Sequence, residues 1–138
     1  MEQLMLGLLM WLGAHSNYSI PDYLPAVEYK TGEELWNIRY GNVPKEEGLD
    51  KILGLFHSKR GEYGTVYLNK NFDPSKKEHQ MILLHELVHF LQFSNKAKFA
   101  CESAKEPEAY DLTKLWLKEN NMPFPFDEAT IHILGLCM

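Results

Sequence analysis

Residues 81–93 carry the sequence MILLHELVHFLQF, in which all but four positions are apolar. A helix that is apolar nearly all round is buried in the interior of a domain. A start signal precedes this stretch, because Ser75 and Glu78 have the spacing of a capping box. The pattern therefore predicts a long buried helix from about residue 75 to about residue 94, around which the rest of the chain packs.

This buried helix contains two histidines and a glutamate. His85 and His89 are four residues apart, which places both imidazoles on one face of a helix, about one turn from each other. Glu86 is rotated about 100° from His85, so it is poorly placed as a further ligand but can accept a proton from a metal-bound water. The spacing predicts a Zn²⁺ site in which His85 and His89 are ligands and Glu86 is the general base.

A structural alternative is that these three polar residues are simply satisfied core residues. Burying two imidazoles and a carboxylate costs free energy unless the groups are paired or bind a metal ion. Because the surrounding helix is so apolar, we favour the metal site over the structural alternative.

A catalytic zinc site needs a third protein ligand. The residues considered are Glu102, Glu106, Glu108, Asp111, His57, His79 and His132. Pro107 predicts the first turn of another helix, which continues to about residue 119. We expect the core face of that helix to contain Ala109, Leu112, Leu115 and Trp116, and Glu108 lies within this arc. Glu106 lies outside it and precedes a proline, which favours a cap residue. Glu108 is therefore the preferred third ligand, and Glu106 stays open as the alternative.

Two neighbours of Glu108 are candidates for supporting roles. Asp111 lies one turn further on and could orient a ligating histidine through its free N–H group, although a solvent-exposed aspartate explains it equally well. Tyr110 could donate a hydrogen bond to a developing oxyanion, although a tyrosine of the core or its rim is the simpler explanation.

The run of residues 84–92, followed by Cys101 and then by Glu106-Pro107-Glu108-Ala109-Tyr110, resembles a group of small uncharacterised bacterial proteins classed as metallopeptidases. More broadly it is similar to the gluzincin branch of the zincins, in which a glutamate on the next helix completes the zinc site. The resemblance covers roughly residues 62–118. It implies a minimal zincin-like domain in which an edge strand precedes the metal helix and binds an extended peptide. Residues 64–69 occupy that place in the sequence.

The leading hypothesis is a zinc metallopeptidase that cleaves a peptide or other amide bond with a zinc-activated water. The alternative is a non-catalytic, zincin-like zinc-binding domain that acts as a regulatory or partner-binding module. The sequence does not indicate a substrate or an oligomeric state.

The remaining segments predict an α+β fold with a small antiparallel sheet packed against the metal helix and further helices. We expect helices at residues 3–14, from the capping box of Thr31 and Glu34 onward, and at 127–134. Strands are expected at 27–30, 52–57 and 65–69, the last two forming a hairpin around a turn at 58–64. Residues 41–48 break the second helix. One domain is expected to span residues 1–138.

Composition excludes some classes of function. The net charge of −5 disfavours nucleic-acid binding, which depends on clustered lysine and arginine. The apolar run of residues 4–12 is too short to span a membrane, and without a basic residue before it we interpret it as a buried or amphipathic first helix rather than an export signal. Cys101 and Cys137 either form one disulfide or stay as two thiols. Localisation stays open between cytoplasm and export.

Overall fold

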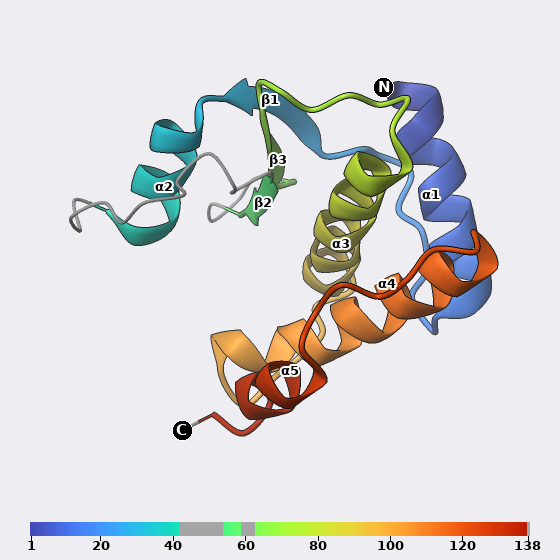
Figure 1. Cartoon of the computed structure of the whole chain (residues 1–138), viewed down its shortest axis with the longest axis vertical. Coiled ribbons are helices and arrows are strands. Elements are labelled where there is room, and N and C mark those ends of the chain that lie inside the picture. The colour runs from blue at the N-terminus through green and yellow to red at the C-terminus, as the bar shows by residue number, and fades with distance from the viewer. Residues whose placement is uncertain (42–53, 59–62, 138) are drawn as a thin grey trace.

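The predicted buried helix forms α3 (Lys77–Ser94), which packs against the first helix of the chain, against the long helix that follows it and against the sheet (Figure 1). The structure, a computed structural model, describes residues 1–41, 54–58 and 63–137. Along the chain the elements are α1 (Glu2–His15), β1 (Ala26–Lys30), α2 (Gly32–Tyr40), β2 (Gly54–His57), β3 (Thr65–Asn69), α3, the 3₁₀ turn η2 (Glu102–Lys105), α4 (Glu106–Glu119) and α5 (Glu128–Leu134). The predicted α+β class is confirmed.

The three strands form one sheet in the order β1-β3-β2. β2 and β3 pair antiparallel, with His57 opposite Thr65, so the predicted hairpin pairing is confirmed. β1 pairs with β3 in parallel, however, and the sheet is therefore mixed rather than antiparallel. Parallel neighbours need a crossover connection, and here that connection contains α2. Parts of three predicted segments, residues 42–48, 52–53 and 59–62, lie outside the described residues.

The position of β3 contradicts the expectation that residues 64–69 form an edge strand. β3 lies in the centre of the sheet, and its backbone N–H and C=O groups pair with β1 on one side and β2 on the other. A strand that is paired on both sides cannot accept a further strand. Among the described residues, no strand pairs with the outer side of β2, so β2 is the edge strand nearest in sequence to α3.

Local signals explain where the helices begin. The predicted capping box at α2 is confirmed: the Thr31 hydroxyl accepts a hydrogen bond from the Glu34 backbone N–H, and the Glu34 carboxylate accepts one from Thr31. The second predicted box is not formed. Asp73 accepts hydrogen bonds from the Ser75 backbone N–H and hydroxyl, so Ser75 belongs to the preceding turn and α3 begins two residues later.

The hydrophobic core lies between α3 and the elements that surround it. β3 contributes Val66 and Leu68, which alternate onto the face of the sheet that is buried. α1 contributes a stripe at helical spacing, as expected for an amphipathic first helix. The buried residues of that stripe are Met5, Leu8, Leu9 and Leu12. No helix within the described residues has the length and hydrophobicity needed to cross a membrane.

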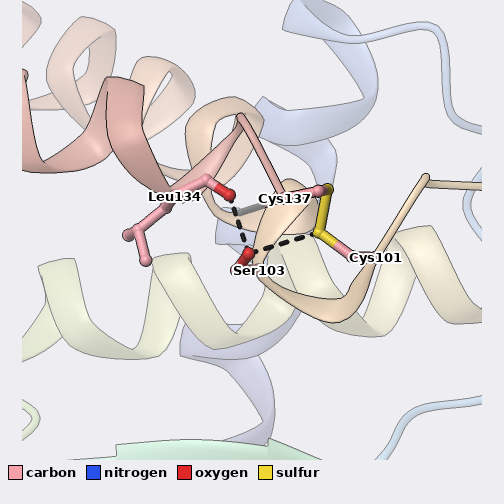
Figure 2. Close-up of a disulfide and its surroundings, with 4 residues drawn as sticks. All are labelled: Cys101, Ser103, Leu134 and Cys137. Carbon is pink, nitrogen blue, oxygen red and sulfur yellow. Dashed lines mark hydrogen bonds between the residues drawn. A yellow bond between two sulfur atoms is a disulfide. The ribbon is translucent and has the colours of Figure 1, made fainter.

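A disulfide joins the segment before α4 to the C-terminal segment (Figure 2). It links Cys101 and Cys137, which are 36 residues apart, and so resolves the pairing that the sequence left open. Ser103 strengthens the same junction, because its hydroxyl donates a 2.7 Å hydrogen bond to the Leu134 carbonyl. The chain around η2 is therefore held against the end of α5 at two points.

Candidate metal centre

The face of α3 that carries both histidines lies next to the start of α4. The Nε2 atoms of His85 and His89 are 3.3 Å apart, as expected for imidazoles one helical turn from each other. His89 is buried, and the His85 side chain is 13% exposed. The two nitrogens therefore converge on one point at the margin of the core.

The carboxylate of Glu106 lies at this point of convergence. Its Oε2 is 2.9 Å from His85 Nε2, and its Oε1 is 3.0 Å from His89 Nε2. One ligand atom from each of the three residues lies within 4.8 Å of the other two. Within the described residues, no other group of three or more His, Cys, Asp or Glu side chains is arranged in this way.

Glu108, the preferred third ligand, lies elsewhere. Its Oε1 accepts hydrogen bonds from the Tyr18 hydroxyl at 2.5 Å and from Gln92 Nε2 at 3.0 Å. The structure thus groups Glu106 with the histidines and directs Glu108 to a neighbouring hydrogen-bond network. The expectation that Glu106 is a non-helical cap fails because η2 runs directly into α4. Glu106 has φ −70° and ψ −42°, which are helical values even though Pro107 follows. The other residues considered as ligands also lie outside the group: Glu102, Asp111, His57, His79 and His132.

Hydrogen bonds and charge control the protonation of the cluster. Burial lowers the pKa of His89, but its hydrogen bond to Glu106 and the charges of Glu86 and Glu106 outweigh burial and raise the pKa. Burial raises the pKa of the Glu106 carboxyl, but hydrogen bonds to His85 and His89 dominate and hold that pKa far below its usual range. In the metal-free protein, Glu106 is therefore an anion that bridges two imidazoles.

Glu86 faces a cleft beside the cluster. The residue is only 8% exposed, yet its carboxylate makes no hydrogen bond to any residue that the structure describes. It lines a cleft of about 760 Å³ together with His85, His89, Glu106 and Tyr110. The edge strand β2 lines the same cleft. A buried carboxylate that is directed into a cleft is available to bind a water molecule or a substrate proton.

Tyr110 also lines the cleft, and its ring centroid is 4.5 Å from that of His85. Burial raises the pKa of its phenol, and the nearby charges of Glu106 and Glu86 raise it further. The phenol therefore stays protonated at neutral pH and can donate a hydrogen bond. Asp111, the other predicted supporting residue, is exposed on the surface of α4 and is not among the residues lining the cleft.

Two residues of the site were not predicted as functional from the sequence. Gln92 accepts a 2.8 Å hydrogen bond from His89 Nδ1, and it connects His89 to Glu108. Tyr18, from the loop after α1, completes this connection by donating to Glu108. Gln92 could have been found, because a glutamine in so apolar a helix needs a buried partner. No signal in the sequence indicates that Tyr18 reaches α4.

The donor set fits a zinc ion. Two imidazoles and one carboxylate are the protein ligands of one class of catalytic zinc site. A tetrahedral ion with bonds of about 2.0–2.1 Å has ligand atoms about 3.3 Å apart. The two imidazole nitrogens, 3.3 Å apart, have this separation, and each of them lies about 3 Å from one of the two Glu106 carboxylate oxygens.

One family model matches this chain. It is described as "Domain of unknown function (DUF6647)", and it covers residues 1–138. The chain belongs to this family. No curated protein and no solved structure matches it. Since the description of DUF6647 gives no activity, function has to be argued from the geometry of the site.

Proposed function

We propose that this DUF6647 protein is a zinc-dependent hydrolase, and that its reaction is the cleavage of a peptide or another amide bond. The observation that carries the proposal is the convergence of His85, His89 and Glu106 in a cleft, beside the free carboxylate of Glu86. Burying these polar groups costs free energy, and their interactions with a bound cation and a reacting water would offset that cost.

Each residue has a role that follows from its position. His85, His89 and Glu106 would hold the ion. Zinc bound there would polarise a substrate carbonyl and lower the pKa of its water toward ~7. Glu86 takes a proton from the attacking water and delivers it to the leaving amine. Tyr110 donates a hydrogen bond to the oxygen on which negative charge develops.

The edge strand β2 supports a peptide as the substrate. Its outer side has no partner strand among the described residues, and Gly54, Leu55, Phe56 and His57 line the cleft that contains Glu86. An extended peptide could pair with β2 through main-chain hydrogen bonds, which give affinity without strong sequence preference. The resemblance implied this role for residues 64–69, and the proposal assigns it to residues 54–57 instead.

Metal content and turnover test the proposal together. We expect mass spectrometry of gently purified protein to find about one zinc per chain, and to find it lost in His89→Ala. Glu86→Gln should keep the zinc but lose at least about 100-fold in turnover of a quenched fluorescent peptide pool, the size of a general-base contribution.

Two results would contradict the proposal at different steps. If the wild type binds no zinc even when zinc is offered, the metal site is wrong. If zinc binds and Glu86→Gln has no effect on any turnover detected, the catalytic role is wrong. A zinc-bound protein without amidase or peptidase turnover would instead favour the non-catalytic zinc-binding domain.

A further inference from the structure

Gln92 occupies a position that links the ligands of the proposed zinc site. It follows His89 by three residues on α3 and is only 2% exposed. Its Oε1 is 2.8 Å from His89 Nδ1. Its Nε2 lies 3.0 Å from the backbone carbonyl of Lys105 and 3.0 Å from Glu108 Oε1. Because Lys105 directly precedes Glu106, one amide group contacts the side chain of one ligand and the backbone next to another.

The partners of Gln92 fix which way its amide faces. A carbonyl and a carboxylate only accept hydrogen bonds, so the amide NH₂ group has to face Lys105 and Glu108. The amide oxygen then faces His89, whose Nδ1 has to carry a proton to donate to it. With Nδ1 used in this way, Nε2 is the nitrogen of His89 that is free to bind a metal ion.

Glu108 in turn is held by Tyr18. The Tyr18 hydroxyl donates to the same Glu108 oxygen that accepts from Gln92. This contact brings together α4 and the loop after α1, which are 90 residues apart in sequence. The Glu108 carboxylate is therefore held in place and cannot rotate away from Gln92 without breaking its bond to Tyr18.

We propose that Tyr18, Glu108 and Gln92 form a positioning relay for the metal centre, which orients His89 and the backbone that carries Glu106. The inference rests on the proposed zinc site. Glu108 is then a positioning residue rather than a ligand, and its carboxylate acts through Gln92. When the Glu108 carboxylate is removed, the Gln92 amide can flip and present its NH₂ group to His89. That would favour the wrong tautomer, in which Nε2 carries the proton.

The test measures zinc affinity by competition with a chelator, beside the melting temperature of the metal-free protein. Glu108→Leu and Gln92→Leu should each weaken zinc binding by about 10- to 100-fold. Glu108→Gln should recover most of that loss, because its amide oxygen still accepts from Tyr18 and Gln92. Combining the two leucine substitutions should cost no more than Gln92→Leu alone, because both act through one chain of contacts. Asp111→Leu, a matched change on the exposed face of α4, should leave zinc affinity unchanged.

Nuclear magnetic resonance gives a second readout. In the zinc-bound wild type, long-range ¹⁵N–¹H correlations should show His89 with a protonated Nδ1 and a metal-bound Nε2. Tyr18→Phe, which changes one oxygen atom, should weaken zinc binding in the same direction and keeps the test valid if Glu108→Leu does not fold. The relay would be overturned by wild-type zinc affinity in any of the variants Glu108→Leu, Gln92→Leu or Tyr18→Phe. It would also be overturned if Asp111→Leu lost as much zinc affinity as Glu108→Leu. If the wild type itself binds no zinc, the proposed function fails first and the relay with it.

Discussion

Shortening the Glu106 side chain gives a direct test of which glutamate completes the site. In Glu106→Asp the carboxylate loses one methylene group and retracts by about 1.5 Å, the length of one carbon–carbon bond. Its oxygens now lie 2.9 and 3.0 Å from the two histidine nitrogens. After retraction those separations become about 4.4 Å, roughly 1 Å more than a tetrahedral zinc ion allows.

We therefore expect Glu106→Asp to lose one zinc–ligand bond. Loss of a direct ligand should exceed the 10- to 100-fold effect of a supporting residue, so we expect at least about a 100-fold fall in zinc affinity, or about 2.7 kcal/mol. Glu108→Asp applies the same shortening two residues away on the same helix. Because Glu108 acts through Gln92, its expected loss is about tenfold.

The assay is a chelator competition at pH 7 with the wild type and both variants at equal concentration. Circular dichroism of the metal-free proteins controls for folding. If Glu108→Asp loses far more affinity than Glu106→Asp, the assignment of Glu106 as the third ligand is refuted, and the geometry of the metal-free site is not that of the bound one.

Other measurements test the scaffold around the site. Replacing both Cys101 and Cys137 by serine opens a loop of 36 residues, which should lower the free energy of unfolding in urea titrations by about 4 kcal/mol. A loss below about 1 kcal/mol would show that the disulfide contributes little to stability. Gly64→Ala should lower the free energy of unfolding by about 3 kcal/mol, because Gly64 has φ +92° and a Cβ there would clash with the ring of Phe56 in β2. An unchanged free energy would mean that this turn adapts to the added methyl group. In the metal-free protein, the lowered pKa of Glu106 adds to the free energy of unfolding above its ordinary pKa of 4.5, and this contribution is lost as the pH falls. The raised pKa of His89 adds to the free energy of unfolding below its ordinary pKa of 6.5, and this contribution is lost as the pH rises through the raised pKa. Melting temperatures in chelator should therefore contain a component that is largest between pH 4.5 and 6.5 and disappears in Glu106→Gln; an unchanged profile in that variant would exclude the ion pair as its source.

Helix α3 could be predicted from the sequence because its signal is local. Apolar positions nearly all round α3 indicated burial, and the i, i+4 spacing of His85 and His89 was enough to bring their nitrogens together. The predicted end at residue 94 is also correct.

The third residue of the cluster was assigned differently because the predicted core face of α4 was shifted around the helix. Ala109, Leu112 and Trp116 are buried as predicted, but the fourth residue of that face is not. Leu115 was counted as core, but it is 38% exposed. Thr113 and Leu117, which are fully buried or nearly so, belong to that face instead. Glu106 precedes these two by seven and eleven residues, so on a helix of 100° per residue it lies between them. Which apolar residue of a short helix is exposed depends on the elements that pack against it, and this information is not local.

The strand order of the sheet could not be predicted from the sequence for a similar reason. The hairpin could be predicted because β2 and β3 are consecutive strands in the sequence. The pairing of Ala26–Lys30 with β3, in contrast, joins residues about 40 positions apart. Nothing in the five residues of β1 specifies a parallel neighbour, so β3 could not be recognised as the central strand from its own sequence.

The disulfide has a further consequence for how the protein can be studied. Cys101 and Cys137 close a covalent ring that contains Glu106, all of α4 and all of α5. A single cut of the backbone inside this ring leaves both pieces attached to each other. Such a nicked chain keeps its full mass on a denaturing gel until a reductant is added. Cleavage near the proposed metal centre would therefore be visible only when reduced and non-reduced samples are compared.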